Sequence, residues 1–197
     1  MHVALIDDDP AVLDSLQIYL GRQGVEVTCF ASADAFVGGN DDCFDCVVAD
    51  VRMPGLSGLD LVRRLAGERR ATPVVLITGH GDIDMAVTAI KLGAFDFIEK
   101  PFDERRLLDA VRNATGEARQ RQAASAEVAE LRARFEGLSD RQRQVFDLAV
   151  TGLSNKEIAS RLGISFRTVE IHRAWMMERM GARNLAELVR IEMQIKA

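Results

Sequence analysis

Three adjacent carboxylates, Asp7, Asp8 and Asp9, directly follow the apolar run Val3 to Ile6. Carboxylates this close raise one another's pKa by roughly 1–3 units unless a cation compensates their charge. Three later apolar runs in the first half of the chain also end in a polar residue, in turn Asp50, Thr78 and Lys100. Acids, a hydroxyl and an ammonium in this order suit the binding of a hard metal ion and a phosphoryl group.

The segments that carry these residues alternate between strand-like and helical patterns. Strands are expected at residues 2–6, 25–30, 46–49, 74–77 and 94–99, with a helix after each. Because each parallel pair of strands needs a crossover, which helices supply, the alternation predicts a doubly wound, five-stranded parallel sheet. Ligands of such sheets bind beyond the carboxyl ends of the strands, where the polar residues fall. Asp9, followed by Pro10, is expected to cap the first helix.

The acidic residues at the strand ends predict phosphoryl chemistry. Asp8 and Asp50 are expected to bind Mg²⁺ or Mn²⁺, with Asp7 assisting through a water molecule, because hard divalent cations prefer oxygen ligands. A carboxylate beside such a cation can attack phosphorus and form an aspartyl phosphate. The Thr78 hydroxyl and the Lys100 ammonium would then stabilise the phosphoryl oxygens.

Residues 3–114 resemble the receiver domain of two-component response regulators. The resemblance is carried by the Asp7/Asp8 pair and by the segments that begin at Asp50 (DVRMPG), Thr78 (TGHG) and Lys100 (KP). It implies a flavodoxin-like α/β fold and phosphorylation of Asp50 by a sensor histidine kinase. It also implies a Mg²⁺ ion held by Asp8, Asp50 and the backbone carbonyl of Arg52.

The same resemblance implies two details near the end of the domain. A cis peptide bond is expected before Pro101, because X-Pro bonds tolerate cis. Phe97 takes the position of the switch aromatic residue, where many relatives carry Tyr. Because phenylalanine cannot donate a hydrogen bond, its switching is expected to act by burial alone. His80, close after Thr78, is interpreted as an exposed loop residue, with shaping of the site or pH sensing as the alternative.

Residues 137–197 are helical in pattern and contain two helices joined by a tight turn. Ser154 and Glu157 form a predicted capping box, and Gly163 is expected to end that helix. Ser165 is expected to cap the next helix, which runs to about Met180. Two helices in this arrangement match a helix-turn-helix, whose second helix enters the major groove of DNA.

Residues 153–159 and 164–172 closely resemble the helix-turn-helix of LuxR-type regulators. Together with the receiver segments, this resemblance places the whole chain near the FixJ/NarL family of response regulators. The family correspondence puts Glu170, Ile171 and Ala174 at base-facing positions, with Thr168 nearby. Phosphate contacts, which fix register rather than sequence, are expected from Lys156, Arg161, Arg167 and Arg173.

Two residues of this predicted recognition helix have alternative interpretations. Glu170 can accept a hydrogen bond from cytosine N4; alternatively it forms an ion pair with Arg167 or Arg173 on the helix surface. Many relatives carry Lys at this position, so this protein need not recognise the same bases as those relatives do. Trp175 is interpreted as a core residue or an interface anchor rather than a base-stacking residue.

Charge is divided unevenly along the chain. Residues 1–116 carry 11 basic and 19 acidic side chains, whereas residues 137–197 carry 10 basic and 7 acidic ones. We therefore expect two modules with different partners, a receiver domain (1–116) and a DNA-binding domain (137–197). The pattern stays helical from Leu107 to about Phe135 with Gly116 as its only break, and residues 117–136, rich in Ala, Gln, Glu and Arg, predict a helical linker. No apolar stretch approaches the roughly 18 residues that a membrane helix needs, so a cytoplasmic protein is expected.

These patterns predict a phosphorylation-dependent transcription regulator with, at most, slow autodephosphorylation. The phosphorylated receiver is expected to form a homodimer whose paired output domains bind promoter DNA, with RNA polymerase as a candidate further partner and no membrane partner. An aspartyl-phosphate phosphohydrolase is disfavoured because Arg52, not an acid, lies two residues after Asp50. A constitutive pseudo-receiver stays open as an alternative. Cys43 and Cys46 spell C-x-x-C, but the pair runs into a strand, so Cys46 is interpreted as a small core residue.

Overall fold

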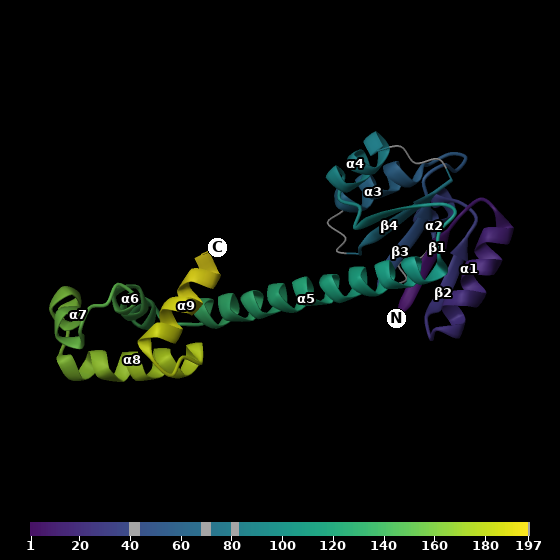
Figure 1. Ribbon diagram of the computed structural model, residues 1–197. Coiled ribbons are helices and arrows are strands. Elements are labelled where there is room, and N and C mark those ends of the chain that lie inside the picture. The colour runs from purple at the N-terminus through teal and green to yellow at the C-terminus, as the bar shows by residue number, and fades with distance from the viewer. Residues whose placement is uncertain (40–43, 68–71, 80–82, 197) are drawn as a thin grey trace. The chain divides into compact units, whose positions relative to one another are not determined.

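The computed structural model describes residues 1–39, 44–67, 72–79 and 83–196 of the 197-residue chain (Figure 1). The chain divides into two compact units, Met1–Gln122 and Ala123–Ala197. The division falls within one long helix, α5 (Glu104–Glu136). The first turns of this helix therefore belong to the first unit and its last turns to the second.

A single parallel sheet forms the centre of the first unit. Its strands lie in the order β2-β1-β3-β4-β5: β1 (His2–Ile6), β2 (Glu26–Phe30), β3 (Cys46–Asp50), β4 (Val74–Thr78) and β5 (Asp96–Glu99). Strands β3 and β4 are buried along their whole length, which accounts for their continuous apolar sequences. The predicted doubly wound sheet is confirmed. Its strand order reverses between β1 and β3, the place where such sheets bind ligands.

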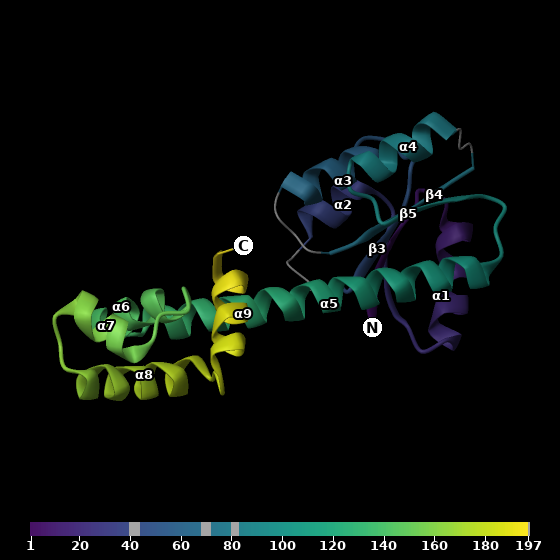
Figure 2. The same ribbon diagram turned by 60° about the vertical axis from the view of Figure 1, so that its left-hand side comes forward.

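Helices cover both faces of this sheet (Figure 2). One face packs against α1 (Pro10–Arg22) and the start of α5, and the other against α2 (Ala33–Gly38), α3 (Gly58–Gly67) and α4 (Ile83–Lys91). Alternate residues of β1 divide between the two cores: Val3 and Leu5 enter the first, Ala4 and Ile6 the second. This follows from the two-residue period of a strand. The helices cover the faces of the sheet, and loops lie at the carboxyl ends of the strands.

The first helix begins where the sequence predicts. Asp9 is the N-cap of α1, and its side chain accepts a hydrogen bond from the Ala11 N–H at 2.9 Å. Ser32 caps α2 in the same way, accepting from the Ala35 N–H at 3.1 Å. Each cap satisfies a backbone donor that has no partner within the helix. One of the three adjacent carboxylates therefore serves local structure.

Helix α5 confirms the helical pattern expected from Leu107 to about Phe135, and Gly116 does not interrupt it. Leu107, Val111 and Ala114 are fully buried and fix the helix to the core of the first unit. A single interior glycine costs only about 1 kcal/mol relative to alanine, which these contacts exceed. Beyond Gly116 the helix stays regular as far as Glu136.

The second unit is wholly helical among the residues described. It contains α6 (Asp140–Ala149), α7 (Asn155–Leu162), α8 (Phe166–Met180) and α9 (Leu185–Lys196), together with the end of α5. Its core is made by residues from all of these helices, among them Phe146, Ile158, Val169, Met176 and Leu188. In the part of the chain that the structure describes, no helix is both long and apolar enough to cross a bilayer.

Capping residues set the ends of these helices. Ser154 and Glu157 form the predicted capping box, and Ser165 caps α8 by accepting from the Thr168 N–H at 3.0 Å. Gly163 ends α7 with a φ of 63°, in the left-handed region that glycine enters without strain. The chain can therefore turn sharply from α7 into α8.

Candidate functional site

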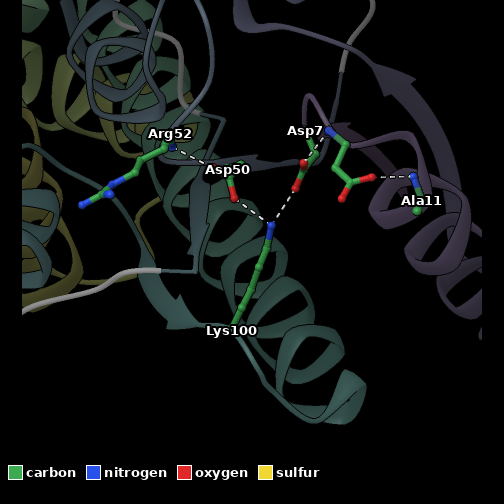
Figure 3. A network of polar contacts seen from close by, with 6 residues as sticks. Asp7, Ala11, Asp50, Arg52 and Lys100 are labelled. Carbon is green, nitrogen blue, oxygen red and sulfur yellow. Dashed lines mark hydrogen bonds and ion pairs between the residues drawn. The ribbon is translucent and has the colours of Figure 1, made fainter.

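Two buried aspartates share one lysine beyond the carboxyl ends of β1, β3 and β5 (Figure 3). The Lys100 Nζ donates to Asp7 Oδ2 at 2.8 Å and to Asp50 Oδ1 at 2.7 Å. Asp7 is 2% exposed and Asp50 7%, whereas the Lys100 side chain is 25% exposed. One ammonium group therefore compensates two buried carboxylates that come from neighbouring strands.

Backbone amides bind the other oxygens of these carboxylates. The Asp9 N–H donates to Asp7 Oδ1 at 2.9 Å, and the Arg52 N–H donates to Asp50 Oδ2 at 2.7 Å. In both cases the chain turns directly after its strand, which brings the amide two residues later back to the carboxylate. Both carboxylates are thus held in place by their own loops.

The charge of this cluster is negative overall. Burial alone would lower the pKa of Lys100, but hydrogen bonds and charges from Asp50 and Asp7 outweigh that effect and raise it above its ordinary value. Lys100 is therefore a cation at neutral pH. Its single positive charge faces two carboxylates, and the exposed Asp8 follows Asp7 directly. An excess of negative charge remains at this edge of the sheet.

This donor set fits a hard divalent cation. Such ions prefer carboxylate, carbonyl and water oxygens, and the excess negative charge favours them over a monovalent ion. Asp8, Asp50 and the Arg52 carbonyl remain the expected ligands, with Asp7 assisting. Among the described residues, no three acidic, histidine or cysteine side chains form a metal-binding group. A bound cation would add to the charge compensation that Lys100 already supplies.

Thr78 and Phe97 lie on the strands next to the acidic cluster. Thr78 ends β4, is fully buried, and its carbonyl accepts from the Lys100 N–H at 2.7 Å. Phe97 in β5 is half-buried and packs against the core beneath α2, α3 and α4. The peptide bond between Lys100 and Pro101 is cis, as expected. His80 lies outside the described residues.

Two residues that position the loop after Asp50 were not found from the sequence. The Asp34 carboxylate, at the start of α2, accepts from the Leu56 N–H at 3.0 Å. A Cβ atom at Gly58 would lie 2.4 Å from the Asp50 carbonyl oxygen, so only glycine fits there. The glycine follows a Pro-Gly turn and could have been suspected, whereas the contact of Asp34 joins residues 22 positions apart.

The cysteines of the first unit carry no sign of redox chemistry among the described residues. Cys46 is fully buried in β3, and burial, aided by the charge of Asp45, raises the pKa of its thiol to about 12. The thiolate, which is the reactive form, is therefore scarce at neutral pH. This agrees with the interpretation of Cys46 as a core residue. Cys43 lies outside the described residues.

Helix α8 presents the predicted base-facing residues on its outer side. Val169, Met176 and Met180 are buried beneath the helix, whereas Ile171 is 40% exposed and Ala174 is exposed. The expected phosphate contacts Lys156, Arg161 and Arg167 are all exposed, and Thr168 is half-buried. Glu170 and Arg173 are half-buried, and the expected contacts of all these residues with DNA stay predictions.

Three side chains of this helix have contacts that refine their expected roles. Glu170 forms the ion pair with Arg167 that was one of its two interpretations, at 3.2 Å. The Arg173 guanidinium donates to Asn155 Oδ1 at 2.9 Å, which ties α8 to the start of α7. Trp175 is 56% exposed, so its interpretation as a core residue is wrong. Its alternative role as an interface anchor stays a prediction.

Comparison with known families assigns both units. Residues 3–112 match the response regulator receiver domain, and residues 136–192 match the bacterial regulatory proteins of the luxR family. The chain is 44% identical to the transcriptional regulatory protein FixJ of Bradyrhizobium diazoefficiens, over 98% of this chain and 95% of that protein. It is 43% identical to the response regulator protein TmoT of Ectopseudomonas mendocina, over 98% and 89%.

Solved structures give the same result. The response regulator StyR matches with a TM-score of 0.87 at 39% identity, over 98% of both chains. Full-length FixJ from B. japonicum matches with a TM-score of 0.62 at 44% identity, over 99% of this chain and 97% of that one. The chain therefore belongs to the response regulators that join a receiver domain to a LuxR-type DNA-binding domain.

Proposed function

We propose that the protein is a transcription regulator whose DNA binding is controlled by phosphorylation of Asp50. The observation that carries the proposal is the buried Asp50, held by Lys100 and by the Arg52 amide in a receiver-type sheet. The same chain carries a LuxR-type helix-turn-helix. The phosphoryl donor is a sensor histidine kinase and the output partner is promoter DNA, so the protein acts in the cytoplasm.

An oxygen of Asp50 attacks the phosphorus of a phosphohistidine, forming a P–O bond as the P–N bond breaks. Lys100 stays charged throughout, because its pKa is raised, and compensates the oxygens of the new acyl phosphate. Mg²⁺ or Mn²⁺, held by Asp8, Asp50 and the Arg52 carbonyl with help from Asp7, would neutralise further charge on the phosphoryl group. No acid lies two residues after Asp50 to hasten hydrolysis, so autodephosphorylation is slow.

The phosphoryl group then acts on Thr78 and Phe97. Its oxygens draw in the Thr78 hydroxyl, which leaves space for the half-buried Phe97 to pack more deeply beneath α4. Helix α4 carries a stripe of exposed apolar residues, with Ile83 82%, Val87 45% and Ile90 51% exposed. This stripe, one helical turn apart at each step, suits a dimer interface formed by the surface of α4, β5 and α5.

Dimerisation would strengthen DNA binding by pairing two output domains. In each domain, Glu170, Ile171 and Ala174 face the bases, while Lys156, Arg161, Arg167 and Arg173 contact phosphates, with Thr168 beside them. The Arg167–Glu170 ion pair must open or tilt before Glu170 accepts from a base. RNA polymerase is the proposed further partner at the promoter.

The test uses the full chain with a small phosphodonor and Mg²⁺. Oligomer size by sedimentation and binding to a random pool of DNA duplexes are measured for the wild type and for Asp50→Asn. Asp14→Asn, an exposed acid on α1, is the matched control. We expect the wild type and the control to dimerise and bind more tightly on treatment, and Asp50→Asn to do neither. Equal responses of all three proteins would refute the proposal.

A further inference from the structure

Helix α8 carries an exposed tryptophan, Trp175, that is not among the residues expected to face the bases. Of the four large apolar side chains exposed on the described part of the second unit, three lie on α8: Phe166, Ile171 and Trp175. Trp175 is 56% exposed, and its ring meets the His172 ring edge-on at 6.2 Å. Because tryptophan is enriched among the residues that dominate binding interfaces, an exposed tryptophan on the predicted recognition helix is a candidate contact residue.

The position of Trp175 around the helix sets it apart from the phosphate contacts already proposed. At 3.6 residues per turn, Trp175 lies roughly 40° from Ile171 and roughly 160° from Arg173. Arg173 faces α7, as its bond to Asn155 shows. Trp175 lies on the other flank, where Gln142 of α6 joins it with Glu178 and Arg179 around an open pocket. The two flanks of α8 therefore carry different contact groups.

We infer that Trp175, with Gln142 and Arg179, contacts the sugar–phosphate backbone of the DNA strand on this second flank. A helix in the major groove has one strand beside each flank, and the flank with Arg173 and Lys156 meets only one of them. This inference rests on the proposed function, because it requires α8 to enter the groove. The proposed contact would hold the second DNA strand without recognising its sequence.

The chemistry of the pocket suits a DNA backbone. Its donors are the Gln142 amide, the indole N–H and the Arg179 guanidinium, while the indole face matches the apolar edge of deoxyribose. Among the four lining residues Arg179 carries the one positive charge, and the acid Glu178 offsets it, so the inferred contact depends mainly on the ring and on the uncharged donors. The effect of the indole should therefore depend little on salt, and that of Arg179 strongly.

The experiment uses the single tryptophan of the chain as its own reporter. The full-length protein is titrated at low salt with a duplex of random sequence, and quenching of Trp175 emission by acrylamide is measured free and bound. We expect DNA to shield the indole. Trp175→Ala should weaken binding about five- to tenfold, near the lower end for an aromatic contact with nucleic acid, while Trp175→Phe should retain most of it. Circular dichroism checks that the variants are folded.

Two further variants distinguish the contact of the indole from an effect of charge and from the loss of any exposed apolar side chain. The slope of the logarithm of the binding constant against the logarithm of the salt concentration measures the ions released on binding. Arg179→Gln should reduce the magnitude of this slope by about one, whereas Trp175→Ala should leave it unchanged. Met193→Ala, which removes an apolar side chain on α9 that is 65% exposed, should bind as the wild type does.

The possible failures are distinguishable. DNA binding that leaves the indole accessible, with wild-type affinity in Trp175→Ala, overturns the inference and leaves the proposed function intact. Shielding on phosphorylation in the absence of DNA would show that a protein surface covers Trp175, and would also overturn it. If the wild type binds no DNA duplex, phosphorylated or not, both the proposed function and the inference are overturned.

Discussion

Replacing Lys100 by methionine is the change that probes the acidic cluster most directly. The variant keeps the aliphatic stem but removes two charge-assisted hydrogen bonds of 2.8 and 2.7 Å. It leaves Asp7 and Asp50, 2% and 7% exposed, without their shared cation. Removing one partner of a buried ion pair costs about 3–5 kcal/mol. Because Lys100 itself is a quarter exposed, we expect a loss of about 2–3 kcal/mol from the unfolding free energy.

The assay follows hydrogen exchange of the β1 and β3 amides of the full chain in urea, without divalent ions. Trp175 emission reports on the second unit and should not change, which provides an internal control. Adding Asp7→Asn to Lys100→Met should recover about half of the loss, because it removes one of the two repelling charges. Mg²⁺ should stabilise Lys100→Met more than it stabilises the wild type.

One result would refute this reasoning. If Lys100→Met exchanges as slowly as the wild type in β1 and β3, and Asp7→Asn brings no recovery, the lysine does not compensate the two carboxylates. Recovery by Asp7→Asn without any effect of Mg²⁺ would support the electrostatic argument but contradict the proposed metal site.

Three further predictions concern separate parts of the first unit. Gly58→Ala should lower the unfolding free energy by about 1–3 kcal/mol and slow phosphorylation by a small phosphodonor, because its Cβ would lie 2.4 Å from the Asp50 carbonyl oxygen. Burial opposes ionisation of Asp45, but hydrogen bonds from the His2 N–H and Arg119 outweigh it and lower its pKa. Asp45→Asn should therefore cost up to about 1 kcal/mol in urea unfolding at neutral pH, and progressively less below about pH 4, as the wild-type carboxylate protonates first in the unfolded chain and, at lower pH, in the folded one. Val87→Ser on α4 should weaken phosphorylation-dependent dimerisation in sedimentation while leaving the phosphorylation rate unchanged, since it removes an apolar side chain from the proposed interface.

The strands and their functional ends could be predicted because each signal is local. A buried strand reads as an unbroken apolar run, and the residue after it marks the carboxyl edge of the sheet. Asp9 could be assigned to its helix for the same reason, since a cap depends on the next few residues. The sequence alone therefore places Asp7 and Asp50 at one edge of the sheet.

The features that were missed depend on contacts between distant segments. The bond from the Leu56 N–H to Asp34 joins a helix start to a loop, and no local pattern marks it. The core interpretation of Trp175 was wrong although helical periodicity places the residue roughly 40° from the exposed Ile171, on the outer side of α8. Gly116 does not interrupt α5, because the burial of Leu107 and Val111 outweighs the local cost of a glycine.

The central claim, that Asp50 accepts the phosphoryl group, is tested most directly by site-resolved mass spectrometry. The full chain is treated with a small phosphodonor and Mg²⁺, and the modified residue is located by fragmentation. We predict the mass of one phosphoryl group on Asp50, and no modification of the folded Asp50→Asn variant. A phosphoryl group on another residue of the wild type, or equal modification of Asp50→Asn, would contradict the account.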